Sequence, residues 1–284
     1  MNEVIKATNK QVELLLESYG RFVQPSNVAH IKGIIRLTDC VITVYETGSI
    51  VFQGKAASEH AQEWQTVFAG SFRVHIGSDE VGTGDFFGPV VVCAAFVNTE
   101  QEAYLTKLGV GDSKGFSDEW IRKMAKAMIP LITHRHVVLM PEYYNKLYAK
   151  HPNLNHIKAL LHNRAILELL EQTGPVPVVM DQFVHETKYF DYLKHQQTVH
   201  RKIEFHTKAE SKFIAVAAAS ILARYYFLEA WDGLERTFQH RLPKGAGELV
   251  DKAASKLFAT LDKSLWGNVA KLHFKNLKKI QTSD

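Results

Sequence analysis

The segment from Gly77 to Val97, GSDEVGTGDFFGPVVVCAAFV, contains the side chains of this chain that are best suited to chemistry. Two adjacent acids, Asp79 and Glu80, are followed by a glycine pair, Gly82 and Gly84. Two interpretations are open for such a segment. It can be a glycine-rich loop that cradles a nucleotide phosphate, or a carboxylate cluster that holds metal ions, and the two predict different enzymes.

The spacing of the glycines disfavours the nucleotide loop. A dinucleotide fingerprint has two residues between its second and third glycines and opens a helix immediately afterwards. Here three residues separate Gly84 from Gly88, and Pro89 leads into a strand-like run of valines. A pyrophosphate would therefore find no helix N-terminus to bind. No Gly-Lys-Ser/Thr follows, so a Walker loop is also excluded.

Acids at the ends of two strand-like runs favour the metal site. Asp79 ends FRVHIGSD, and Asp181 ends the apolar run VPVVMD. An isolated carboxylate is costly to bury unless a counter-charge neutralises it. Divalent cations prefer oxygen ligands, and Mg²⁺ combines a few carboxylates with substrate phosphate. A solvated turn residue is the alternative for either acid alone.

A further acid, Glu210, precedes a run of small residues in FHTKAESKFIAVAAASILARYY. Small side chains let a helix pack close to a sheet, which would bring Glu210 toward the strand ends. An acid at a helix start is also favoured by the helix dipole alone, so both explanations stay open. Lys208 and Lys212 flank Glu210 and suit phosphate contacts, although ordinary solvated lysines fit equally well.

The first part of the chain reads as a small α+β unit. A capping box at Thr8 and Gln11 predicts a helix that Gly20 closes. Strand-like runs follow as HIKGIIRL, CVITVYE and SIVFQG, the last two forming a hairpin, and residues 58–68 have a helical pattern. The segment TVFAGSF is the expected junction.

From Phe72 onward the pattern predicts a mixed sheet covered by helices. Three strand-like runs come first: FRVHIGSD, GPVVVCAAFV and HRHVVLMP. Helices are predicted over 117–128, 154–172 and from about Glu210 to Trp231, with the strands VPVVMD and RKIEFH between the last two. Meandering strands followed by strand–helix alternation indicate the α/β class.

The composition is that of a folded, soluble protein of about two domains. The chain has 284 residues, 46% hydrophobic, and a net charge of +4, which tolerates an anionic partner without proving one. Cys40 and Cys93, without a CxxC motif, favour buried free thiols over zinc, and a disulfide stays open. The N-terminus lacks a signal-peptide core, and the run FIAVAAASILA is shorter than the ~20 residues of a membrane span. We therefore expect a cytoplasmic protein without a membrane partner.

Four motifs follow the order and spacing of the type 2 ribonucleases H: DEVGTGDFFGPVVV, GVGDSKGFSD, VVMDQF and HTKAESKFIAVAAASILAR. The chain resembles this family from about residue 72 onward, and most closely its ribonuclease HIII branch. The N-terminal unit, with GSIVFQGKAA, is similar to the TATA-binding-protein-like domain associated in that branch with gripping the substrate. The resemblance implies a ribonuclease H-like α/β sheet flanked by helices in residues 70–284, and a small α+β substrate-binding domain in residues 1–66.

The resemblance also implies an activity: endonucleolytic hydrolysis of the RNA strand of RNA/DNA hybrids, leaving 5′-phosphate and 3′-hydroxyl ends. Two Mg²⁺ or Mn²⁺ ions would serve as cofactors, with no organic cofactor, and the chain would act as a monomer. The implied catalytic and metal-binding residues are Asp79, Glu80, Asp181 and Glu210. The implied substrate-binding residues are Gly82, Thr83, Gly84, Ser113, Lys114, Lys208 and Lys212.

Two departures from ribonuclease HII point to the HIII branch. The Gly-Arg-Gly loop of ribonuclease HII is replaced in this chain by Gly82-Thr83-Gly84. The segment LPKGAGELVD stands where ribonuclease HII has its tyrosine motif. The resemblance therefore implies cleavage within longer RNA stretches rather than at a single embedded ribonucleotide. A transposase-like or resolvase-like two-metal nuclease and a non-catalytic nucleic-acid-binding module are the alternatives. A basic tail that includes Lys271 is either a phosphate contact or solvated.

Overall fold

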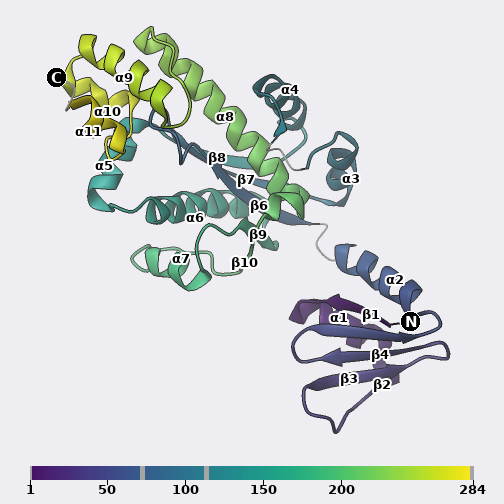
Figure 1. Ribbon diagram of the computed structural model, residues 1–284. Coiled ribbons are helices and arrows are strands. Elements are labelled where there is room, and N and C mark those ends of the chain that lie inside the picture. The colour runs from purple at the N-terminus through teal and green to yellow at the C-terminus, as the bar shows by residue number, and fades with distance from the viewer. Residues whose placement is uncertain (1, 71–73, 112–114, 282–284) are drawn as a thin grey trace. The chain divides into compact units, whose positions relative to one another are not determined.

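The computed structural model describes residues 2–70, 74–111 and 115–281, and contacts divide the chain into two compact units, residues 1–73 and 74–284 (Figure 1). The elements of the first unit are β1 (Asn2–Lys6), α1 (Asn9–Tyr19), η1 (Gly20–Phe22), β2 (Val23–Gln24), β3 (Ile31–Arg36), β4 (Cys40–Tyr45), β5 (Ser49–Gly54) and α2 (Ala57–Gly70).

The first unit is an antiparallel sheet, in the order β1-β5-β4-β3-β2, with its helices on one face. The Thr8 capping box, the Gly20 end of α1 and the β4–β5 hairpin are confirmed. Strand β1 was not predicted from the sequence, because its alternating, mostly polar residues gain their structure by pairing with β5. Helix α2 places Trp64 and Phe68 in this unit's core, so the unit extends beyond residue 66.

The second unit contains the larger sheet and its covering helices (Figure 1). Its elements are β6 (His75–Val81), β7 (Val90–Val97), α3 (Thr99–Lys107), α4 (Asp118–Met128), β8 (His134–Leu139), α5 (Pro141–Lys150), α6 (Leu154–Thr173), β9 (Val178–Asp181), α7 (Glu186–Tyr192), β10 (Ile203–His206), η3 (Ala209–Ser211), α8 (Ile214–Phe238), α9 (Glu248–Thr260), η4 (Lys263–Leu265), α10 (Trp266–Val269) and α11 (Lys275–Gln281).

The larger sheet is mixed, as the sequence pattern predicts. Its order is β10-β9-β6-β7-β8. Strand β7 lies antiparallel to both β6 and β8, whereas β9 lies parallel to both β6 and β10. The carboxyl ends of β6, β9 and β10 therefore meet at one edge of the sheet. In open α/β sheets, this edge is where ligands usually bind.

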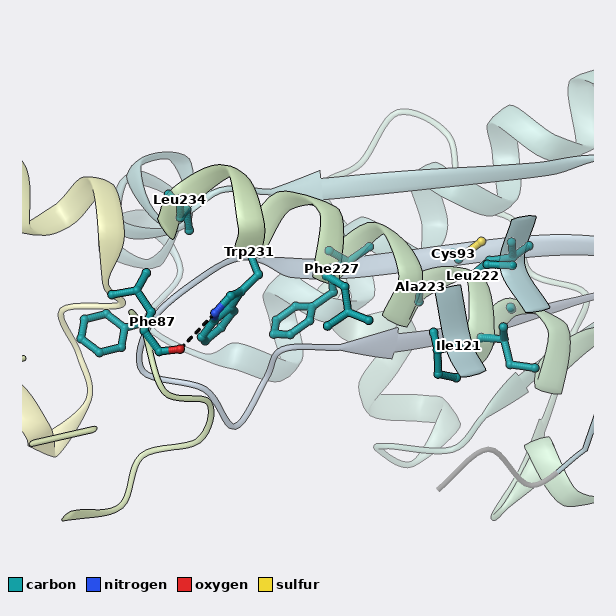
Figure 2. Close-up of a cluster of buried hydrophobic side chains, with 14 of the residues drawn as sticks. Phe87, Cys93, Ile121, Leu222, Ala223, Phe227, Trp231 and Leu234 are labelled. Atoms are coloured by element: carbon teal, nitrogen blue, oxygen red, sulfur yellow. Dashed lines mark hydrogen bonds between the residues drawn. The ribbon is translucent and has the colours of Figure 1, made fainter. Parts of the chain in front are cut away.

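Two apolar layers cover the faces of this sheet. On β7, Val91 and Cys93 pack into the cluster that contains the buried face of α8, while Val90 and Val92 pack into the cluster that contains α6. Because alternate residues of a strand point to opposite faces, α8 and α6 lie on opposite sides. Figure 2 shows part of the α8 layer, in which Trp231 donates a hydrogen bond to a backbone carbonyl.

Helix α8 lies very close to strand β6. A Cβ atom at Gly77 would stand 2.1 Å from the backbone nitrogen of Val216, so only glycine permits this approach. The small residues around Val216 provide the matching surface on the helix. One expectation is wrong: α8 begins at Ile214, and Glu210 lies in the separate turn η3, so a dipole at the start of α8 does not explain Glu210.

Helix α8 is long and apolar enough to cross a membrane by length and composition, but 61% of its most apolar window is buried inside the protein. Its packing against β6 and β7 accounts for that composition. Cys40 and Cys93 are both free and buried.

Candidate active site

Asp79 and Glu80 point to opposite faces near the carboxyl end of β6. Asp79 is hydrogen-bonded to Ser220 of α8, and one of its carboxylate oxygens accepts the Glu80 backbone N–H at 2.8 Å. The Glu80 carboxylate faces α6, where it forms an ion pair with Lys158 and a 2.9 Å hydrogen bond with His162. The two neighbouring acids are therefore held by different helices.

Asp181 brings the third acid to the same sheet edge and connects it to the fourth. It ends β9, the parallel neighbour of β6. Its Oδ1 atom accepts the backbone N–H of Ala209 at 2.8 Å, and this bond ties the strand end to turn η3. Glu210, the next residue of that turn, is only 6% exposed. Residues remote in the sequence are thus gathered by one strand edge and one short turn.

The electrostatics of Asp79 are those of a site that needs a counter-charge. The pKa of Asp79 is raised to about 8, first by burial and further by the charges of Glu80 and Asp181. The hydrogen bond from Ser220 offsets the rise only in part. Since like charges repel across a poorly solvated space, Asp79 cannot ionise cheaply beside Glu80 and Asp181 unless a further cation is bound.

The pKa of Glu80 is shifted in the opposite direction to that of Asp79. Burial alone would raise the pKa of Glu80, but the hydrogen bond and charge of His162, together with Lys158, outweigh burial and hold that pKa below its ordinary value. Adjacent carboxyl groups with pKa values pushed apart are typical of functional sites. Glu80 is thus ready as a carboxylate, whereas Asp79 depends on a further positive charge.

The donor set fits hard divalent cations that are only partly enclosed by protein. Among the residues that the structure describes, no three His, Cys, Asp or Glu side chains form a ready-made cage for an ion. Mg²⁺ rarely needs such a cage, because it is usually bound by one or two carboxylates plus water and substrate phosphate. Asp79 and Asp181, near Glu80 at the sheet edge, suit that mode of binding. Glu210 follows Ala209, whose backbone N–H is hydrogen-bonded to Asp181.

The raised pKa predicts a pH-dependent effect of Asp79 on stability in the absence of metal. Because folding favours the protonated acid, ionisation should cost stability progressively as pH rises from about 4 to about 8. Asp79→Asn removes that cost. In EDTA at pH 8 we expect this variant to gain about 1–2 kcal/mol in the free energy of unfolding, which corresponds to a rise in Tm of about 2–8 °C. Thermal unfolding of both proteins from pH 5 to 9 measures the difference, which should shrink toward pH 5. Parallel curves would contradict the electrostatic argument.

The glycine loop has one structural glycine and one that the fold does not require. Gly82 has a φ of +89°, and a Cβ atom there would stand 2.2 Å from the carbonyl oxygen of Pro89. Gly84 is exposed, and nothing lies within 4 Å of the position of its Cβ. Thr83, between them, is half-buried. Gly84 is therefore open to an approaching ligand.

The loop that follows is anchored by Lys271, which is not part of a solvated tail as one interpretation held. Lys271 is fully buried, and its Nζ donates to the backbone carbonyls of Asp85, Phe87 and Gly88 at 2.7, 3.1 and 2.7 Å. Burial lowers the pKa of Lys271 to about 7, and the charge of Asp85 offsets only part of this. The C-terminal segment thus fixes the residues directly after the glycine pair.

The other candidate substrate residues lie in different situations. Lys208 and Lys212 are exposed on either side of Glu210, and the Nζ of Lys212 donates to the carbonyl of Thr207 at 2.9 Å. Ser113 and Lys114 lie outside the described residues. Lys158 and His162 were not expected from the sequence. The signal available was two polar residues, one helical turn apart, on the apolar face of α6.

Comparison with known protein families gives two matches that together span most of the chain. The family described as Ribonuclease HII matches residues 76–277. A domain of unknown function (DUF3378) matches residues 2–70. Among similar proteins, Ribonuclease HIII of Bacillus cereus (strain ATCC 10987 / NRS 248) is 39% identical over 301 residues, covering 97% of this chain and 96% of the relative. Ribonuclease HIII of Bacillus anthracis is also 39% identical, over 98% of this chain and 97% of the relative.

Solved structures agree with these matches. The crystal structure of Bst-RNase HIII in complex with Mn²⁺ is similar over 100% of this chain and 99% of its own, at 35% identity and a TM-score of 0.73. The crystal structure of Aquifex aeolicus RNase H3 is similar over 96% of this chain and 100% of its own, at 28% identity and a TM-score of 0.62.

Proposed function

The chain belongs to the ribonuclease HII family, in its ribonuclease HIII branch, and from this premise we propose that it hydrolyses the RNA strand of RNA/DNA hybrids with two divalent metal ions. The observation that carries the proposal is the placement of Asp79 and Asp181 at the ends of parallel neighbouring strands, where their charges repel. The Mn²⁺ complex of the similar Bst-RNase HIII supports the use of such ions here. Mg²⁺ is the other candidate.

Asp79, Glu80, Asp181 and Glu210 would supply the oxygen ligands. Two ions held by these residues would supply the chemistry of an in-line phosphoryl displacement, namely activation of a water and stabilisation of the leaving oxygen. The carboxylates then need only hold position, and Ser220, Lys158 and the Ala209 N–H fix three of them. The proposed products carry 5′-phosphate and 3′-hydroxyl ends.

Gly84 is proposed to let the loop backbone approach the ribose 2′-hydroxyl, the group that distinguishes RNA from DNA. We expect Gly84→Ala to fold normally, with Tm within ~2 °C of wild type, but to lower hybrid cleavage about tenfold or more, because the new methyl group stands between backbone and ribose. Gly82→Ala should instead lower Tm, because of the positive φ and the Pro89 carbonyl. Tm and kcat/KM of both variants measure the contrast. A Gly84→Ala enzyme with wild-type kinetics would remove Gly84 from recognition.

The exposed lysines beside Glu210 are proposed to contact the substrate backbone. Lys208 and Lys212 are exposed on either side of the turn that carries Glu210. Contacts from such lysines to phosphate position a duplex without reading its sequence.

The N-terminal unit is proposed to grip the hybrid through the open face of its sheet. Core residues such as Ile42 and Phe52 point toward the helices. On the other face of the sheet, Arg36 and Gln53 are the neighbours of Val41 on the two adjacent strands, and both are exposed. We expect a chain that begins at Val74 to bind hybrid about tenfold or more weakly, because these contacts are lost, while single-turnover cleavage at saturation changes much less. Fluorescence anisotropy and rapid-quench kinetics separate the two effects. Unchanged affinity would show that the unit serves another purpose.

One assay tests the proposed function. Labelled RNA/DNA hybrid, RNA duplex and DNA duplex are each incubated with the full-length protein and Mg²⁺, Mn²⁺ or EDTA. We expect cleavage of the RNA strand of the hybrid with either metal and none with EDTA. Equal cleavage of DNA duplex would favour the transposase-like or resolvase-like alternative, and binding without cleavage would favour the non-catalytic module. Hybrids with RNA tracts of different lengths give the minimum tract that is cut.

A further inference from the structure

Two buried polar side chains on the inner face of α6 serve no apolar packing purpose. Lys158 is 7% exposed and His162 is 0% exposed, and they lie one helical turn apart among Ile157, Leu161 and Ala165. Apolar side chains of similar volume would bury at least as favourably there, since a buried ion pair gains little net stability. Their presence points to a role in the neighbouring site.

Both side chains end on the Glu80 carboxylate, one on each oxygen. Lys158 contacts Oε1, and His162 Nε2 lies 2.9 Å from Oε2. The other ring nitrogen of His162 is 2.7 Å from the hydroxyl of Ser78, which itself donates to the Cys93 carbonyl at 3.1 Å. The chain of contacts therefore begins at the backbone of β7 and ends at a proposed metal ligand.

Lys158 and His162 also contact the chain just beyond the end of β9, the strand that carries Asp181. The Lys158 ammonium lies 3.9 Å from the centroid of the Phe183 ring, and the His162 ring stacks on that ring at 5.4 Å. Phe183 follows Asp181 by two residues, directly beyond β9. Through these two side chains, helix α6 contacts Glu80 on β6 and Phe183 just beyond the end of β9.

From these contacts we infer that Lys158 and His162 are positioning residues, which hold the Glu80 carboxylate at the sheet edge and fix it relative to the strand end that carries Asp181. The inference rests on the proposed function, since it assigns a purpose to groups behind the metal-binding acids. Partners that orient a ligating carboxylate act on metal binding itself, and their loss typically costs about 10–100-fold in metal affinity or activity.

The test is Mn²⁺ binding to the full-length protein without substrate, measured by isothermal titration calorimetry and by the electron paramagnetic resonance of free Mn²⁺. Lys158→Met and His162→Leu are each expected to weaken Mn²⁺ binding about tenfold or more, because Glu80 loses an orienting partner. Lys158→Arg keeps a cationic donor and should recover part of the affinity. Arg164→Met, on the exposed side of the same helix, is the matched control and should bind as wild type does. Wild-type Mn²⁺ affinity in Lys158→Met would overturn the inference.

A double-mutant comparison keeps the test decisive if removal of Lys158 alone prevents folding. Glu80→Gln/Lys158→Met leaves no unpaired charge at the ion pair, so it should fold. If Lys158 acts through Glu80, this double variant should bind Mn²⁺ as Glu80→Gln alone does, and a further loss of affinity would contradict the inference. Cleavage by Lys158→Met should recover toward the wild-type kcat as metal is raised. If wild type itself binds no Mn²⁺, the proposed metal site fails, which is a separate outcome.

Discussion

Asp79→Asn and Asp181→Asn are each expected to lower the rate of hybrid cleavage by about 10³-fold or more, equivalent to about 4 kcal/mol of transition-state stabilisation. An amide keeps the size of the side chain, so the hydrogen bonds from the Glu80 and Ala209 N–H groups can persist. It carries no charge, however, and is a poor ligand for a hard cation. Single-turnover cleavage of a labelled hybrid at saturating Mg²⁺ measures the loss.

Hybrid binding should survive both substitutions, because the proposed contacts of Gly84, Lys208 and Lys212 are untouched. Glu248→Gln, at an exposed acid on α9, is the control for loss of a negative charge elsewhere and should cleave at the wild-type rate. Turnover near wild type in Asp79→Asn or Asp181→Asn would remove that residue from the mechanism.

Lys271→Met is expected to destabilise the protein by about 3 kcal/mol, since three buried or partly buried carbonyl oxygens would lose their shared donor at about 1 kcal/mol each. Methionine has a similar length but cannot donate a hydrogen bond. For a protein of this size, the loss corresponds to a fall in Tm of about 6–12 °C. Chemical denaturation followed by circular dichroism gives the free energy of unfolding directly.

Lys275→Met is the matched control for Lys271→Met, because Lys275 is an exposed lysine four residues further on. It should change the free energy of unfolding by no more than about 0.5 kcal/mol. A Lys271→Met protein as stable as this control would show that the three carbonyls find other donors, and that the C-terminal segment does not hold the glycine loop.

Local signals predicted much of the fold. The Thr8 capping box, the Ser117 cap of α4 and the Gly174 end of α6 lie where local hydrogen bonding places them. Strand β1, the helices α3, α5 and α7, and the helices after α8 were not predicted. Strand β1 depends on pairing with residues far along the chain, which no local pattern records. For the same reason α8 was expected to begin at Glu210, although that residue belongs to a turn held by Asp181.

The acids of the site could be proposed from the sequence, but their supports could not. Asp79 and Asp181 each end a recognisable strand-like run, and the parallel pairing of the two strands brings both acids to one edge. Lys158 stands 78 positions from Glu80, and Lys271 stands more than 180 positions from the carbonyls that it binds. The polar pair on the apolar face of α6 shows at most that Lys158 is unusual, and no local pattern identifies the partner of either lysine, because the partners are assembled only by the fold.

Anomalous diffraction from crystals of the full-length protein with Mn²⁺ and a non-cleavable RNA/DNA hybrid tests the central claim most directly. Two manganese peaks about 4 Å apart are expected at the sheet edge, contacted by oxygens of Asp79 and Asp181 and by a phosphate of the RNA strand. Peaks elsewhere on the chain, or a hybrid seated at that edge with no metal near Asp79, would contradict the proposed site.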